Sequence, residues 1–295
     1  MPWSMAGVAI DSAGVTGGTE LTPAALRRYS RLPRMTAIDH GDVAAPVHDH
    51  RRDPRSGLVG HREVVAATQT IRSAFLPWLQ PDRSTVVLGG CCTLMIGLGA
   101  ATRDKIGRFG IAYVDGHLDL YDGQSSPSGE AADVPLATML GHGDPGVLAA
   151  AGGASLSPDG VFLLGYRDAS QALGHGSLMP EDFGPDFRHA DTPAIRAAGP
   201  AKTGAAARAH FDALDLPFWL FLDVDALDPD VFPATDALIG DGLNWAEVEA
   251  LAGPLARSPR LLGLVVTCYN PEKDPDGACG RRLGEFIESV VEANP

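Results

Sequence analysis

The stretch GIAYVDGHLD at residues 110–119 decides the fold, because a short apolar run ends there in a cluster of polar side chains. Its counterpart is FWLFLDVDALDP at residues 218–229, which has the same arrangement. An apolar run of about four to eight residues bounded by turn residues is typical of a buried β-strand. Open α/β sheets bind their ligands beyond the carboxyl ends of such strands, so both segments indicate an α/β protein with a site at one edge of its sheet.

Outward from these segments, the chain alternates short apolar runs with longer amphipathic ones. Strands are predicted at Met5–Ile10, Ser84–Leu88, Gly110–Val114, Gly160–Leu164, Trp219–Leu222 and Leu261–Val266. Helices are predicted to begin at Thr22, to follow GGCCT as far as about Thr102, and to span His61–Leu79, Pro193–Leu214, Asn244–Ala256 and Arg282–Ala293. Residues 14–18 should form a Gly-rich turn, residues 40–60 a loop, and residues 122–159 a long loop with one short helix. This alternation predicts a three-layer α/β/α fold with a mostly parallel central sheet, in a single domain spanning residues 1–295.

The composition argues against several functional classes. Of the 295 residues, 45% are hydrophobic, which is enough for a large core and argues against disorder. Lys and Arg total 23 against 37 Asp and Glu, a formal net charge of −14, so we expect neither nucleic acid nor membrane as a partner. The opening residues show neither a basic segment nor a long apolar one, and the four cysteines do not suggest a disulfide framework. We therefore expect a cytoplasmic protein with reduced thiols.

The two polar segments are suited to bind a cation. Asp115, His117 and Asp119 lie at alternate positions and would share one face of an extended chain. Asp223 and Asp225 have the same spacing. Burying these carboxylates without a counter-charge is costly, and neither segment contains Lys or Arg, so a metal ion is the natural partner. Oxygen ligands with one imidazole favour Mn²⁺ among common divalent ions; the alternative is that the aspartates only cap turns.

These motifs resemble the signatures of the arginase/agmatinase (ureohydrolase) family over nearly the whole chain. DGHLD at 115–119 is similar to DAHxD, FLDVDALDPDVFP at 221–233 is similar to SxDxDxxDPxxxP, and GGCCT at 89–93 stands where the family has GGDHS. The resemblance implies an arginase-like fold and two divalent metal ions, with Mn²⁺ favoured. It assigns Asp115 and Asp223 to both ions, Asp119 and Cys92 to the first ion, and His117 and Asp225 to the second.

The resemblance also implies an activity. Such enzymes hydrolyse a C–N bond of a linear guanidino, hydroxyguanidino or amidino compound and release urea or a urea-like product. Asp225 would hold and relay a proton during this reaction. The expected partner is a small guanidino-type molecule, and the relatives assemble as trimers or hexamers.

Three departures from the family pattern bear on the activity. Cys92 replaces the histidine of GGDHS; it is either a thiolate ligand, which would shift the preference toward Zn²⁺ or Fe²⁺, or a small buried apolar residue. In having a cysteine at this position, the sequence resembles the Nω-hydroxy-L-arginine hydrolase branch of the family. Ala132 replaces the proton-shuttling histidine of the loop SGEAADVP at 128–135, and Asp133 or His142 could substitute for it. The candidate substrate contacts, Ser128, Tyr121 and Cys268, differ enough from the arginase pattern that L-arginine is not expected as the main substrate.

Two competing functions stay open at this point. The protein could be a metal-binding relative without hydrolytic activity that serves as a binding or scaffold protein, a hypothesis that the three departures favour. It could also cleave amides as the related deacetylases do, although five retained ligands argue against their one-zinc site. A dinucleotide-binding fold is not supported, because no GxGxxG follows the first predicted strand.

Overall fold

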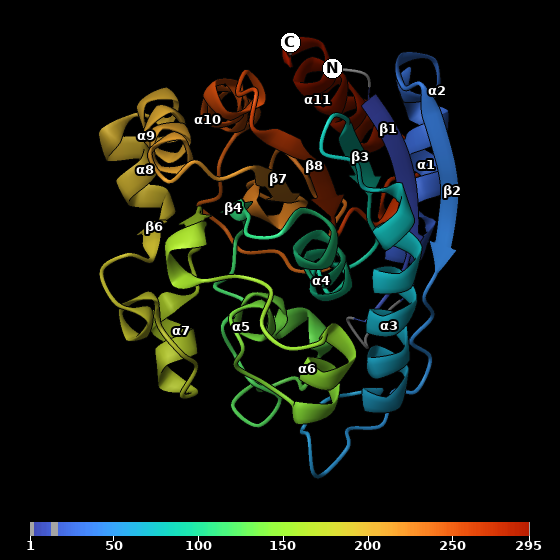
Figure 1. Cartoon of the computed structure of the whole chain (residues 1–295), viewed down its shortest axis with the longest axis vertical. Coiled ribbons are helices and arrows are strands. Elements are labelled where there is room, and N and C mark those ends of the chain that lie inside the picture. The colour runs from blue at the N-terminus through green and yellow to red at the C-terminus, as the bar shows by residue number, and fades with distance from the viewer. Residues whose placement is uncertain (1–2, 13–16, 295) are drawn as a thin grey trace.

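The computed structural model describes residues 3–12 and 17–294, and its centre is a parallel β-sheet. In this part of the chain eight strands form one sheet in the order β2-β1-β3-β8-β7-β4-β5-β6, and every neighbouring pair is parallel. The strands are β1 (Trp3–Ala9), β2 (Ile38–Ala44), β3 (Ser84–Leu88), β4 (Gly110–Val114), β5 (Val161–Leu164), β6 (Arg188–Ala190), β7 (Phe218–Asp223) and β8 (Leu261–Thr267). Figure 1 shows β2 at one side of the molecule, β6 at the other, and the two chain termini close together. The predicted parallel sheet is confirmed.

Helices cover both faces of the sheet because the central strands are apolar on both sides. All residues of β3, β4 and β7 are buried. Alternate residues of β7 enter different cores: Trp219 and Phe221 join one, while Phe218, Leu220 and Leu222 join the other. The two cores lie on opposite faces of the sheet, and each is completed by buried side chains from the helices on its own side. This arrangement gives the predicted three layers.

The helices divide between these two cores. One core receives side chains from α3 (His61–Trp78), α4 (Leu94–Ile106), α5 (Pro135–Met139), α6 (Pro145–Ala151) and α7 (Ala169–Gly174). The other receives them from α1 (Thr22–Tyr29), α2 (Leu32–Met35), α8 (Thr192–Ala198), α9 (Pro200–Ala213), α10 (Trp245–Ala256) and α11 (Ala278–Ala293). Among the described residues, none of these helices has both the length and the apolar character required to cross a membrane.

Three expectations about local structure are wrong. Residues 40–44, expected in a loop, belong to the edge strand β2; most of its side chains are exposed, so it lacks the apolar pattern of a buried strand. The helix expected over Pro193–Leu214 is two helices, α8 and α9, because Gly199 has a positive φ of 93° and Pro200 starts a new helix. Residues 122–159 contain two short helices, α5 and α6, instead of one. The turn expected at residues 14–18 lies mostly outside the described residues.

The strand order brings the predicted motifs to one edge of the sheet. β3, β8, β7 and β4 are consecutive in its middle, and all run in the same direction. Their carboxyl ends therefore lie side by side. The residues that follow them are Cys91 and Cys92 after β3, Cys268 after β8, Asp225 after β7 and Asp115 after β4.

Candidate metal centre

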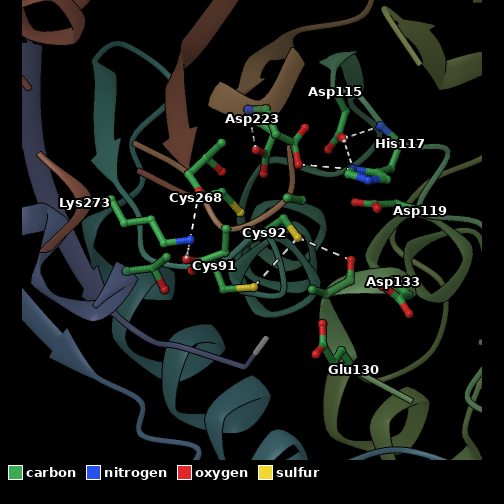
Figure 2. Close-up of a pocket in the computed structure, with 16 residues that line it drawn as sticks. Cys91, Cys92, Asp115, His117, Asp119, Glu130, Asp133, Asp223, Cys268 and Lys273 are labelled. Atoms are coloured by element: carbon green, nitrogen blue, oxygen red, sulfur yellow. Dashed lines mark hydrogen bonds and ion pairs between the residues drawn. The ribbon is translucent and has the colours of Figure 1, made fainter. Parts of the chain in front are cut away.

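A pocket of about 240 Å³ opens at this edge of the sheet. All six predicted metal ligands line it, among them Asp225, which is also a predicted catalytic residue; a second predicted catalytic residue, Asp133, and one predicted substrate contact, Cys268, line it as well. Figure 2 shows the carboxylates and the cysteine sulfurs facing this common space. Its full lining is Thr19, Cys91, Cys92, Asp115, His117, Asp119, Glu130, Ala132, Asp133, Asp223, Asp225, Thr235, Asp236, Ala237, Cys268 and Lys273.

Asp115, His117 and Asp225 form a compact group that could hold a metal ion. One ligand atom from each lies within 4.8 Å of the other two. His117 Nδ1 is 3.1 Å from Asp225 Oδ2 and 3.6 Å from Asp115 Oδ1. The other oxygen of Asp115, Oδ2, is buried and has no hydrogen-bond partner among the described residues. A buried carboxylate oxygen without a donor is costly, and a cation at this place would satisfy it.

The electrostatics of this group also indicate a missing positive charge. Burial raises the pKa of Asp115 to about 7, and the charge of Asp225 adds to this effect. Burial also raises the pKa of Asp119 and Asp223 well above the usual range, with further contributions from neighbouring carboxylates. Asp225 is the exception: burial opposes its ionisation, but the charge of His117 and a hydrogen bond with it hold its pKa below the usual value. One imidazole therefore balances one carboxylate, and the others need a cation.

Asp119 and Asp223 line the same pocket but lie outside that compact group of described residues. Tyr113 donates a hydrogen bond from its hydroxyl to Asp119 Oδ2 at 2.6 Å, and its ring stacks on Phe221. Thr267 donates to Asp223 Oδ2 at 2.8 Å. Both carboxylates are thus oriented by hydroxyl donors, and Asp223 Oδ1 also accepts a hydrogen bond from Asp225 N at 3.1 Å.

The strand end GYRD supports both Asp-rich segments. Arg167 Nη2 donates to the carbonyl oxygens of Asp225 at 2.8 Å and Ile239 at 3.0 Å, and Nη1 donates to that of Ala226 at 3.1 Å. Asp168 accepts a hydrogen bond from Leu118 N at 3.1 Å. These contacts fix the position of the backbone that carries the predicted ligands.

The structure brings together three cysteines. The sulfur atoms of Cys91, Cys92 and Cys268 all lie within 4.8 Å of one another, and those of Cys91 and Cys92 are 3.9 Å apart. Hydrogen bonds with Cys268 and Cys92 lower the pKa of the Cys91 thiol, and the hydrogen bond with Cys268 raises that of Cys92. Cys92 also donates to the carbonyl oxygen of Ala132 at 3.3 Å. Cys91, which the sequence left without a role, thus shares the pocket with the predicted ligand Cys92.

Three other predicted residues lie away from the pocket lining. His142 and Tyr121 line a separate hollow, and the His142 ring packs edge-on against Phe183. Ser128 donates a hydrogen bond to Asp133 Oδ2 at 2.6 Å, so it positions that carboxylate. Of the two residues predicted to replace the loop histidine, only Asp133 therefore reaches the pocket.

Sequence reasoning missed a group of polar side chains on the lining. Glu130 comes from the loop that carries Ala132, while Asp236 and Lys273 come from segments that follow β7 and β8. Lys273 Nζ is 2.6 Å from Asp236 Oδ1 and also donates to the carbonyl oxygen of Thr235 at 3.1 Å. The signal for Glu130 was present, since an acidic residue within an active-site loop is a candidate ligand contact; the Lys273–Asp236 pair had no local signal.

Glu130 should make the stability of the protein depend on pH. Burial raises its pKa from 4.5 to about 8, and the charge of Asp133 adds to the shift. Between these two pH values the folded chain keeps a proton that the unfolded chain releases, so the free energy of unfolding falls as the pH rises through this window. We expect Glu130→Gln to remove this contribution, which leaves a flatter curve of the thermal midpoint Tm against pH.

Thermal unfolding of both proteins at a series of pH values measures this effect. Glu272→Gln, at an exposed glutamate, is the control and should follow the wild type. Parallel curves for Glu130→Gln and wild type would contradict the prediction.

Known proteins resemble this chain in sequence and in fold. The Arginase family model matches residues 2–290. An arginase of Staphylococcus aureus (strain MRSA252) is 26% identical over 262 residues, covering 86% of this chain and 85% of that protein. The native structure of arginase from Bacillus caldovelox superposes with a TM-score of 0.86 at 24% identity and covers 98% of both chains. Proclavaminate amidino hydrolase from Streptomyces clavuligerus superposes with a TM-score of 0.68 at 18% identity, covering 99% of this chain and 91% of its own. The chain therefore belongs to the arginase family.

Proposed function

We propose that this protein is a hydrolase that uses two divalent metal ions to cleave a C–N bond of a linear guanidino, hydroxyguanidino or amidino compound, releasing urea or a urea-like product. The observation that carries the proposal is the buried Asp115 Oδ2, which lacks a donor in a group with His117 and Asp225. Family membership supports the same class of reaction.

The donor set fits divalent cations. Asp115 and Asp223 would serve both ions, Asp119 and Cys92 the first ion, and His117 and Asp225 the second. Carboxylate oxygens with one imidazole suit Mn²⁺, the ion that we propose for the second position. When bound, divalent ions supply Lewis acidity and lower the pKa of water toward neutrality.

The residues of the chain would bind the substrate and move protons. Asp133 places negative charge on the lining, which attracts a cationic guanidinium group, while Asp236 is paired with Lys273 and Glu130 keeps its proton at neutral pH. Asp225 would hold and relay a proton, since its Oδ2 lies beside the pocket at 3.1 Å from His117 Nδ1, while His117 serves the ion. Asp133 is the acid nearest to the place of the missing loop histidine, because it follows Ala132 directly.

The substrate proposed here is not L-arginine. Ala132 cannot transfer a proton, and Cys268 cannot form the ion pair with a guanidinium that a carboxylate would form. The relatives named arginase and proclavaminate amidino hydrolase show by their names that this fold serves more than one amidino substrate. A hydroxyguanidine is favoured because its leaving fragment needs less help from a general acid. We further propose a cytoplasmic location and assembly into homo-oligomers.

A substrate panel tests the proposal. Protein saturated with Mn²⁺ should release urea or hydroxyurea from at least one of a set of linear guanidines, hydroxyguanidines and amidines, while apo protein should release none. The metal content is measured on the same samples by elemental analysis. No release from any compound by fully metallated protein would contradict the proposal and favour a metal-binding protein without hydrolytic activity.

A further inference from the structure

We propose that Cys91, Cys92 and Cys268 together form a binding site for one thiophilic metal ion of the zinc class, next to the Asp115–His117–Asp225 group. The inference deepens the proposed function and rests on it in one respect, since Cys92 is there assigned to the first ion. It adds sulfur ligands from Cys91 and Cys268 to the first position, while the second position has only oxygen and nitrogen ligands.

The backbone places the three cysteines by means of neighbouring strands. Cys91 and Cys92 follow β3, and Cys268 follows β8, which pairs with β3 in parallel register. Cys268 N donates to the carbonyl oxygen of Gly90 at 2.8 Å, so the two strand ends are joined where the cysteines begin. Cys268 has a positive φ of 65°, a conformation that costs free energy for a residue with a side chain. Sheet pairing thus holds all three sulfurs in place before any ion binds.

The distances suit an ion bound by thiolates. A zinc ion lies about 2.3 Å from each thiolate sulfur, which requires sulfur atoms separated by about 3.8–4.0 Å in tetrahedral or trigonal geometry. The sulfurs of Cys91 and Cys92 are 3.9 Å apart, and all three lie within 4.8 Å of one another. Only a small movement of Cys268 is needed to complete the triangle.

The surroundings of Cys91 favour its thiolate form and place no protein cation beside it. Ser12 donates a hydrogen bond to the Cys91 sulfur at 3.2 Å, and Thr93 lies within hydrogen-bonding distance of the same atom at 3.7 Å. Hydroxyl donors of this kind stabilise the charged form of a sulfur. Lys273, the one Lys or Arg among the described lining residues, is paired with Asp236. A buried Cys91 thiolate would therefore need a bound cation.

The neighbouring group has a different preference. Asp115, His117 and Asp225 offer carboxylate oxygens and an imidazole. Among the described residues, these three and the three cysteines form two separate groups of candidate metal ligands. Soft thiolates select zinc-class ions, while carboxylates suit Mn²⁺ and Mg²⁺. The pocket thus has two adjacent positions, and each prefers a different kind of ion.

Cobalt binding tests the site without depending on activity. Reduced, metal-free protein titrated with Co²⁺ should develop an intense near-ultraviolet sulfur-to-cobalt band, which one equivalent of Zn²⁺ abolishes. Cys91→Ser, Cys92→Ser and Cys268→Ser should each reduce the band in proportion to the lost sulfur and weaken zinc binding by more than the about 10–100-fold typical of a lost outer partner. Cys279→Ser changes the fourth cysteine, which lies outside the cluster, and should keep the full band.

Thiol reactivity provides a second measurement that needs no variant. In zinc-loaded protein we expect three of the four thiols to resist alkylation, with Cys279 reacting, and all four to react after chelation under denaturing conditions. Equal reactivity of loaded and metal-free protein, or a disulfide within the cluster in the protein as purified, would overturn the inference. Urea release by Mn²⁺-loaded protein without a cobalt band would overturn this inference alone; a cobalt band with a silent substrate panel would overturn only the proposed function.

Discussion

Asp115→Asn should lower the rate of urea release by at least about 10³-fold while the protein stays folded. Asp115 is 1% exposed, and one of its oxygens has no partner among the described residues. An amide cannot supply the negative charge that a divalent ion needs, so the ions that make water nucleophilic at neutral pH are lost. The fold should tolerate the change, because burial already raises the pKa of Asp115 to about 7 and the uncharged amide relieves its repulsion with Asp225.

Two readouts separate a lost ion from a lost fold. Mn²⁺ should raise the Tm of the wild type, since a ligand that binds only the folded state stabilises it, and should leave the Tm of Asp115→Asn unchanged. The metal-free variant should unfold at or above the temperature of the metal-free wild type. Asp186→Asn, at an exposed aspartate outside the pocket, is the control and should keep both activity and the Mn²⁺ response. A variant that binds two ions and stays active would contradict the role of Asp115.

Gly90→Ala should destabilise the protein by at least about 3 kcal/mol, the upper part of the range for an overpacked core. A methyl group at Gly90 would lie 1.9 Å from the carbonyl oxygen of Ile10. This carbonyl belongs to the backbone and already accepts a hydrogen bond from Cys91 N at 2.9 Å, so it cannot move aside without breaking a contact. The substitution should therefore separate the ends of β1 and β3 and displace the adjacent cysteines.

Chemical denaturation measures the loss, and a second glycine provides the control. Gly174 ends α7 with nothing within 4 Å of the added methyl group, so Gly174→Ala should be neutral or slightly stabilising. The sulfur-to-cobalt band should weaken in Gly90→Ala and persist in Gly174→Ala. Equal free energies of unfolding for the two variants would show that the close approach at Gly90 has no energetic consequence.

Local patterns were sufficient for the elements whose side chains are uniformly buried or regularly spaced. Ser84–Leu88 and Gly110–Val114 are strands with the predicted bounds, because a short apolar run bounded by glycine and polar residues is typical of a covered strand. Exposed or interrupted elements were not predictable in this way. The edge strand β2 is mostly polar, and the break between α8 and α9 depends on one glycine.

The parallel α/β fold and the candidate site at the two Asp-rich segments were predictable from the sequence, because alternation and spacing are properties of neighbouring residues. Which distant side chains share the pocket was visible only in the folded chain. Cys268 meets Cys91 and Cys92 because β8 pairs with β3, and Glu130 reaches the lining while His142 does not. Such contacts between distant residues depend on the strand order and on the paths of the loops. Both arise from the packing of the whole chain and leave no periodic pattern in any one segment.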